Sequence, residues 1–426
     1  MTGEPWHRDL GPLRLRLRRS LIAVPLLYLA AAIVLGFVVP GIDAERGAVI
    51  SPLGGIDSTA KDVLSAVGTG MLAFTGIVIA GVLLVVQFAA SQYSPRLVLW
   101  FRRDRIAKHA IGCFLASSVF AVVALYSIDA QGMSFDADLT IGVAIALLVG
   151  SSVLFLALLQ RITDRLRPRT LFAAVVKEGV LAARDTYPLE PDADDRAWER
   201  ADATVVEHEG SPGVVASFRL QALVALAVQA DAVVELVPAV GEYVGAHRPL
   251  LRVHGGTGLE PAALRAQVLV ADERTIEQDP AFALRIVVDT AVRALSPAVN
   301  DPTTAVHALD ALQTLVRELA LHDIEASHAR DERSVVRLAW PVPTWPDMLE
   351  LAFSEIRQYG ASSVQVCRRL RAVLEDLLAA TPPRRHEAIA AELARLDAAV
   401  LANHPAGSPD RERAMVADRI GLGFSR

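Results

Sequence analysis

Cysteine and lysine are both scarce in this chain. Its 426 residues include two cysteines, Cys113 in an apolar run and Cys367 far away in a polar region. A pair placed in this way does not indicate a disulfide framework, so we expect most of the chain to lie in a reducing compartment. The lysines are Lys61, Lys108 and Lys177. Covalent chemistry that needs a lysine amine is therefore excluded from every segment without one of these three residues.

One such segment resembles the turn of a biotinyl- or lipoyl-type domain. Val240–Val244, followed by Pro249–Val253, contains a glycine suited to a tight turn and a valine that starts a new strand. Biotin and lipoate are attached to lysine, and this segment has none. The resemblance therefore implies only a structural, sandwich-like module.

Catalytic and metal-binding motifs are also missing. The sequence has no serine nucleophile elbow, no P-loop and no dinucleotide fingerprint. His254, His307 and His322 do not have the spacing of metal ligands. We expect no enzymatic activity, no metal and no cofactor.

Charge is absent from the middle of four long apolar runs. Each run is long enough to cross a bilayer as a helix, and 53% of the residues are hydrophobic, with a mean hydropathy of +0.37. Proton relays normally need ionisable groups at membrane depth, so a proton-coupled pump is disfavoured, whereas a channel that uses backbone and hydroxyl groups is not. The runs are Leu21–Val39, Leu64–Ala90, Ile106–Ile128 and Leu139–Leu159.

The charges between these runs alternate in sign. The segments before the first run, between the second and third, and after the fourth are rich in arginine, whereas the other two loops are acidic on balance. Because arginine and lysine of short loops are retained on the cytoplasmic side, all five segments indicate four crossings with both termini inside. The acidic outer residues include Asp57, Asp62, Asp129, Asp136 and Asp138.

The first nineteen residues form a basic arm. Leu10, Leu13, Leu17 and Leu21 recur at helical spacing among four arginines, which is typical of a short helix on an anionic membrane surface. No aromatic or motif context indicates binding to nucleic acid. The bilayer is therefore the expected partner of the arm.

The second run carries a stripe of small and polar residues. At helical spacing, Thr69, Gly76, Ala80 and Gln87 lie on one face, together with Ala73, among large apolar side chains. One interpretation is close packing between helices, because small residues let backbones approach. The other is that the stripe lines an aqueous path, because polar groups at membrane depth usually face away from lipid. The pore-lining candidates are Thr69, Gly76, Ala80 and Gln87.

The chain changes character after Arg169. We predict a basic cytoplasmic arm over residues 1–19, a four-helix transmembrane domain over 20–160, a juxtamembrane helix and linker over 161–197, a cytoplasmic α+β domain over 198–345 and a C-terminal helical subdomain over 346–426. Short β-branched runs predict strands in the fourth part. The expected strands are 204–207, 213–218, 233–237, 250–254, 267–271 and 334–340.

The stretch Asp279–Leu319 is the most distinctive part outside the apolar runs. Asp279-Pro280 and Asp301-Pro302 both look like a helix cap followed by proline at the first helical position. Ala294–Ala305, between two predicted helices, gathers five polar side chains that are conceivable ligands. Capping alone explains Asp301, so both interpretations remain open. The candidates of this loop are Ser296, Asn300, Asp301, Thr304 and His307.

Three segments of the sequence carry a resemblance to a known protein family. Ser91–Arg96, Asp279–Phe282 and Ala294–Ala305 together resemble the bacterial predicted-membrane-protein family called domain of unknown function 2254. The resemblance extends from the first apolar run to about Leu319 and implies an architecture. It implies no particular activity.

We therefore expect an integral membrane protein with four transmembrane helices and a C-terminal cytoplasmic α+β domain, in the inner (plasma) membrane of a bacterium. The function we predict is an oligomeric channel or pore for inorganic ions. The second helix lines its path, the cytoplasmic domain gates it, and it weakly favours cations. The alternative is a non-conducting, membrane-anchored sensor or scaffold. Homo-oligomers are expected for the channel.

Overall fold

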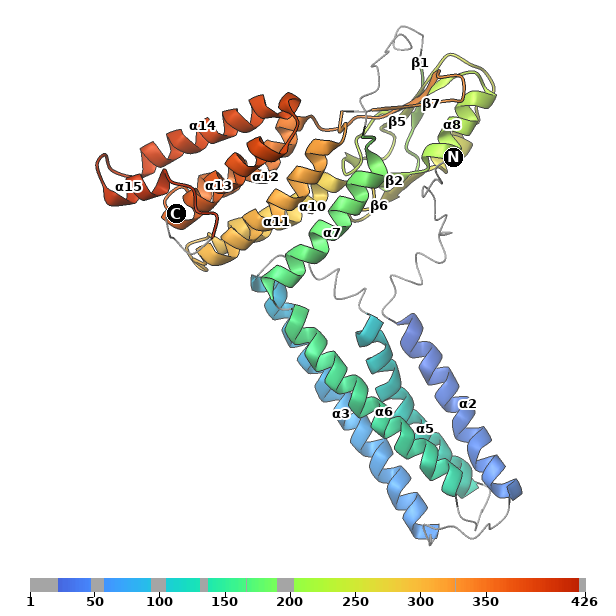
Figure 1. The fold of residues 1–426 in the computed structure, drawn as a ribbon. Helices are drawn as coiled ribbons and strands as arrows, with labels where there is room; N and C mark the ends of the chain where they lie inside the picture. The colour runs from blue at the N-terminus through green and yellow to red at the C-terminus, as the bar shows by residue number, and fades with distance from the viewer. Residues whose placement is uncertain are drawn as a thin grey trace. The chain divides into compact units, whose positions relative to one another are not determined.

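The chain divides into two compact units, Met1–Arg167 and Pro168–Arg426. The structure is a computed structural model, and it describes residues 22–46, 57–92, 105–130, 137–165, 167–189, 203–325 and 327–420 (Figure 1). The basic arm of residues 1–19 and Ser94–Arg96 lie outside the described residues. Each unit is described by itself below.

The first unit contains four long apolar helices, as the sequence predicts. All four are long and apolar enough to cross a membrane. Helix α2 continues through Pro40 to Arg46, whereas we expected it to end at that proline. Asp43 lies in this extra part, and its carboxylate accepts a hydrogen bond from Thr140 at the start of the fourth helix. The helices are α2 (Ala23–Arg46), α3 (Asp57–Gln92), α5 (Arg105–Ala130) and α6 (Asp138–Arg165).

Helix α5 forms the centre of this unit, because α2, α3 and α6 all pack against it. Its side chains Phe114 and Phe120 are fully buried. Glycines allow two close approaches: a Cβ on Gly112 would lie 2.8 Å from the Tyr28 ring, and one on Gly36 would lie 2.8 Å from Val123. The bundle is therefore a packed core of apolar side chains.

Buried polar groups in the first unit bond mainly to backbone and hydroxyl groups. Asp43 of α2 is 6% exposed. Its carboxylate accepts hydrogen bonds from the backbone N–H of Leu139 and Thr140, at 3.2 and 2.9 Å, and from the Thr140 hydroxyl at 2.7 Å. These donors are in the first turn of α6, so one helix caps another. At the same end, Lys61 Nζ lies 2.5 Å from a carboxylate oxygen of Asp129 and links α3 to α5.

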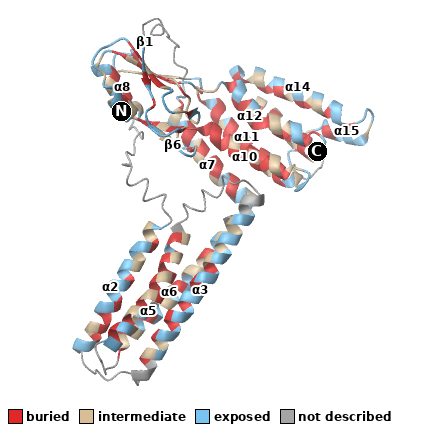
Figure 2. Cartoon of the chain, turned by 180° about the vertical axis from the view of Figure 1, so that it is seen from behind, coloured by how far each residue is buried: buried red, intermediate tan, exposed pale blue. Residues whose placement is uncertain are grey.

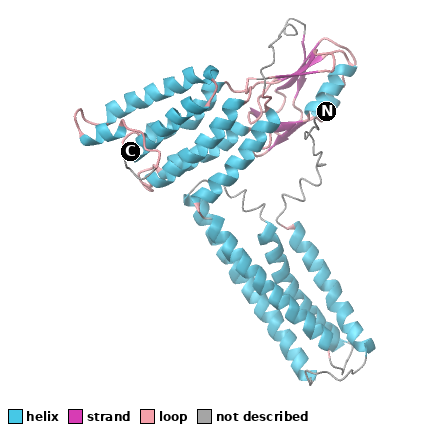
Figure 3. Ribbon diagram, viewed as in Figure 1, coloured by secondary structure: helices cyan, strands magenta, loops and turns pink. Residues whose placement is uncertain are grey.

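The second unit contains two sheets. The five-stranded sheet has the order β1-β5-β3-β8-β7, with β3 and β8 parallel, and the three-stranded sheet has the order β4-β2-β6. The predicted strands are present, with boundaries shifted by at most a few residues (Figure 3). Gly241 has a φ of 90° and makes the predicted turn before β4. The strands are β1 (Ala203–Glu207), β2 (Gly213–Phe218), β3 (Val233–Leu236), β4 (Tyr243–Val244), β5 (Pro249–His254), β6 (Val268–Ala271), β7 (His328–Arg330) and β8 (Val336–Ala339).

Helices make up the rest of this unit. Helix α8 packs on β3, β7 and β8, and α7, α10, α11, α12 and α13 pack side by side. We expected α7 as a juxtamembrane helix and α10 and α11 as helices of the α+β domain, and apolar contacts join these three helices in one layer. A Cβ on Gly179 of α7 would lie 2.7 Å from Ala283 and 2.9 Å from Leu315. The helices are α7 (Pro168–Thr186), α8 (Leu220–Gln229), α9 (Pro261–Arg265), α10 (Pro280–Ala294), α11 (Pro302–Leu321), α12 (Trp345–Gly360), α13 (Val364–Ala380), η3 (Pro383–Arg385), α14 (His386–Asn403) and α15 (Pro409–Ala414).

Candidate functional sites

The predicted stripe of α3 lies on the outside of the four-helix unit. Thr69, Gly76, Ala80 and Gln87 are all exposed, as is Ala73 (Figure 2). Outside α3 itself, no atom of the part of the chain that the structure describes lies within 4 Å of a Cβ built on Gly76. On the other side of the same helix Leu64, Met71 and Thr75 are buried. The stripe therefore faces away from the core of its own bundle.

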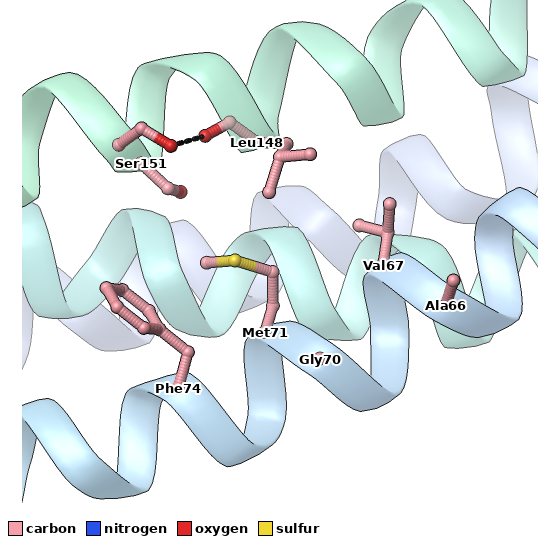
Figure 4. A pocket seen from close by; sticks show the side chains of 8 residues that line it. Ala66, Val67, Gly70, Met71, Phe74, Leu148 and Ser151 are labelled. Carbon is pink, nitrogen blue, oxygen red and sulfur yellow. Dashed lines mark hydrogen bonds between the residues drawn. The ribbon is translucent and has the colours of Figure 1, made fainter.

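A groove between α3 and α6 lies beside this face. Its volume is about 390 Å³. Met71 of α3 extends from its helix towards α6 (Figure 4). Phe74 of α3 and Phe155 of α6 form a T-shaped pair, with ring centroids 5.0 Å apart. The groove is mostly apolar. The lining residues are Ala66, Val67, Gly70, Met71, Phe74, Leu148, Ser151 and Ser152.

Hydroxyl groups in this unit mostly bond to the backbone of their own helix. Thr75 donates to Met71 O at 2.6 Å, Ser152 to Leu148 O at 2.9 Å and Ser117 to Cys113 O at 2.8 Å. Ser117 and Ser151 also share a hydrogen bond of 2.8 Å between α5 and α6. Such bonds satisfy polar groups in an apolar medium and hold helices together.

The second candidate site, the α10–α11 loop (Leu295–Asp301), is built mainly by capping. Asp301 accepts hydrogen bonds from the Thr304 backbone N–H at 3.1 Å and from the Thr304 hydroxyl at 2.6 Å. Ser296 Oγ donates to Arg293 O at 2.7 Å, and Asn300 turns the chain with a φ of 47°. Asp279 caps α10 in the same way, by accepting from Phe282 N at 3.1 Å. The two caps predicted from Asp-Pro pairs are thus present.

His307 lies one turn further along α11 and is half-buried. Burial, and to a smaller extent the charge of Arg169, lowers the pKa of its imidazole below the usual value, although Asp310 and Asp301 oppose this shift. Asp310 is paired with Arg369 at 2.6 Å. The loop brings together four of the five predicted polar residues, but the hydrogen bonds of their side chains stay within the last turn of α10, the loop and the first turn of α11, and His307 is set apart.

The described residues contain no group of three or more histidine, cysteine, aspartate or glutamate side chains that could hold a metal ion. The sequence did not single out Asp43, because it looked like one acidic residue of an outer loop. The available signal was that Asp43 follows an apolar run so closely that it lies on the same helix if the helix continues past the run. It is the most buried carboxylate of the described part of the first unit.

Comparison with known proteins places this architecture in a family. The model of the family described as predicted membrane protein, domain of unknown function 2254, matches residues 18–376. Uncharacterized proteins of Mycobacterium bovis and Mycobacterium tuberculosis are 28% identical over 422 residues, which cover 94% of this chain and 79% of each relative. No solved structure matches the chain. The chain therefore belongs to the predicted-membrane-protein family called domain of unknown function 2254.

Proposed function

We propose that several copies of the chain assemble around α3 and form a channel or pore for inorganic ions. The observation that supports this proposal is the position of the α3 stripe. A single bundle has a core filled by Phe114, Phe120 and other apolar side chains, while the small and polar face of α3 points outward. A path through the membrane would therefore run between copies, and the second unit would gate it.

The exposed surface of α3 is not uniform, and its composition supports this arrangement. Leu72 and Ile77 flank the stripe and are 63% and 72% exposed. Such side chains suit lipid or a helix contact, whereas Thr69 and Gln87 are costly in lipid and suit water. Small residues between them leave room for a path. The acidic outer loops would raise the local concentration of cations at low salt, and the cytoplasmic arginines would oppose this preference.

The proposed orientation places the protein in the inner membrane with both termini in the cytoplasm. Its basis is the alternation of charge between the helices. Single cysteines at positions 57, 136 and 200 test it in intact cells with a thiol reagent that does not cross membranes. We expect labelling at 57 and 136 and none at 200. Labelling at 200 alone would contradict the orientation.

A non-conducting sensor or scaffold is the second candidate. It is favoured by the hydroxyls of Thr75, Ser117 and Ser152, which are bonded to backbone carbonyls and so supply no lining for a path within one bundle. In this role α3 would only pack against another copy. Neither candidate includes enzymatic activity or a cofactor.

Flux through the purified protein in liposomes separates the two candidates. We expect potassium flux larger than chloride flux at low salt. Gly76→Leu should abolish it without changing the mass of the oligomer, because a leucine at this position fills the path. Ile77→Leu is the matched control on the neighbouring lipid-facing surface and should conduct normally. A well-assembled oligomer that shows no flux under any voltage or osmotic condition would favour the scaffold.

A further inference from the structure

The start of α7 is held close to the membrane by the covalent chain. The candidate membrane span of α6 ends at Asp164, and α7 begins at Pro168. Four extended residues reach at most about 14 Å. The first turn of α7 therefore stays within this distance of the end of the span, however the second unit is turned.

The α10–α11 loop lies at the same end of the helical layer as the start of α7. Helices α7 and α11 pack in parallel, because Arg184 bonds to Glu318 and the Tyr187 carbonyl oxygen bonds to His322, at separations of 134 and 135 positions. Because residues about 134 positions apart face each other in this pair of helices, Arg169 lies beside the first turn of α11, directly after the loop. Figure 1 shows the loop and the start of α7 at one end of the layer.

The tip of this loop is exposed and held in one conformation. Pro297, Ala298, Val299 and Asn300 are all exposed, and Val299 is 37% exposed. Backbone hydrogen bonds close the loop on both sides of the tip, from Val299 N and Asn300 N to Ser296 O and from Asp301 N to Ala294 O at 2.8 Å. An apolar side chain is thus presented to the surroundings by a preformed turn.

An exposed tyrosine lies at the same end of the helical layer as the α10–α11 loop. Tyr359, at the end of α12, is 53% exposed. Its neighbour Gly360 is close to the loop, since a Cβ on it would lie 3.3 Å from Leu295. Tyrosine is enriched where protein meets the headgroup layer of a membrane.

The charges at this end favour an anionic surface. Arg169 of α7 is exposed at this end, and Arg161, Arg165 and Arg167 precede it in the chain. Two nearby carboxylates are already engaged, Asp301 as a helix cap and Asp310 in its pair with Arg369, and Asp164 is the one acidic residue among these arginines in the chain. Basic residues beside a membrane span attract anionic lipids.

We propose that the α10–α11 loop, the first turn of α7 and Tyr359 form a docking surface for the anionic headgroups of the inner leaflet. The arginines bind lipid phosphates, and Val299 and Tyr359 enter the headgroup layer. Docking would fix the second unit at the membrane, whether or not the protein conducts.

Site-specific fluorescence of the full-length protein in nanodiscs tests this surface. A probe on Val299→Cys is compared with one on Leu321→Cys, the matched control, because Leu321 is 43% exposed at the other end of α11. The discs contain either phosphatidylcholine alone or a mixture with phosphatidylglycerol, and a nitroxide on the lipid headgroup serves as quencher. We expect quenching at position 299 that increases with the anionic lipid, and little quenching at position 321.

Variants of the arginines sharpen the test. Arg167→Gln and Arg169→Gln should each lower the docking equilibrium about fivefold, which corresponds to the attraction of one arginine to an anionic surface. Arg169→Lys should retain docking. Equal quenching at 299 and 321, or quenching that does not depend on the anionic lipid, would overturn the proposal. Protection of position 299 from an aqueous quencher without quenching by lipid would also overturn it, because another protein surface would then cover the loop.

Discussion

The two units satisfy their buried polar groups in different ways. In the four-helix unit, Asp43 and the buried hydroxyls bond to backbone groups and to one another. In the second unit, buried carboxylates face arginine: Glu392 is fully buried between Arg357 at 2.7 Å and Arg395 at 3.0 Å. The guanidinium of Arg395 also reaches water, because its side chain is 56% exposed. The difference agrees with the four candidate membrane spans of the first unit.

Glycines of the four-helix unit occupy two different environments. Gly36 and Gly112 are needed for close contacts within the unit, whereas a Cβ built on Gly76 or Gly142 meets no atom of the described residues within 4 Å outside its own helix. Glycine inside a helix normally costs about 1 kcal/mol relative to alanine. Glycines without a neighbour among the described residues outside their own helix are therefore expected to serve a contact or a path outside the bundle.

The largest effect is expected at Glu392. Glu392→Ala should lower the free energy of unfolding by about 3 kcal/mol, because it leaves the half-buried guanidinium of Arg357 without its carboxylate. Thermal unfolding of the full-length protein in detergent, followed by the fluorescence of buried Trp340 and Trp345, measures this. The matched control is Arg395→Ala, which removes an exposed partner and should cost less than about 1 kcal/mol. Equal losses would show that burial does not distinguish the two partners.

Substitution of glycines in the four-helix unit should change its free energy of unfolding by less than the loss of Glu392 does. Gly112→Ala should destabilise the four-helix unit by about 2 kcal/mol, because the new methyl group overlaps the Tyr28 ring. Gly142→Ala should be neutral or slightly stabilising, because the methyl group meets open space. Resistance to unfolding in sodium dodecyl sulfate compares the two variants. A loss at Gly142 as large as that at Gly112 would reveal an additional contact at that position.

Removal of the cap between helices should have an intermediate effect. Asp43→Ala should cost about 1.5 kcal/mol, because the first turn of α6 loses its acceptor. Asp43→Asn keeps one acceptor oxygen and should cost less. A double-mutant cycle with Thr140→Val isolates the bond between the two side chains. Coupling near zero in that cycle would contradict the hydrogen bond of 2.7 Å.

The smallest effect is expected at Asp301. Asp301→Ala should cost about 1 kcal/mol, and Asp301→Asn or Asp301→Ser much less, because each can still cap α11. The same thermal unfolding experiment measures these differences. A membrane phenotype that is lost in the Asn and Ser variants at unchanged stability would show that the carboxylate has a role beyond capping.

Much of the architecture could be predicted from the sequence, because its signals are local. Apolar runs define the four helices, and Asp-Pro pairs define the starts of α10 and α11. The continuation of α2 past Pro40 could not be predicted, because it coincides with a bond from Asp43 to α6, distant in sequence. The grouping of α7 with α10 and α11 depends in the same way on the contacts of Gly179.

The candidate sites could be predicted only in part. Helical spacing gives the stripe of α3, but only the structure shows that Thr69, Gly76, Ala80 and Gln87 face away from the bundle. The five polar residues of the α10–α11 region were grouped by their proximity in sequence. The structure joins Asp301 and Thr304 by hydrogen bonds and assigns His307 to a separate, half-buried position. Sequence spacing alone does not define which bonds a side chain makes.

The central claim is that the outward face of α3 lines a water-filled path, and cysteine accessibility tests it most directly. The native thiols should not interfere, because both are buried and burial raises the pKa of the Cys367 thiol to about 11. Cysteines at Gly76 and Ala80 are compared with cysteines at Leu72 and Ile77 in intact membranes, with a charged, water-soluble thiol reagent. We predict rapid labelling at Gly76 and Ala80 and none at Leu72 and Ile77. Equal protection of all four positions, in a protein that labels at Asp57→Cys, would contradict the path.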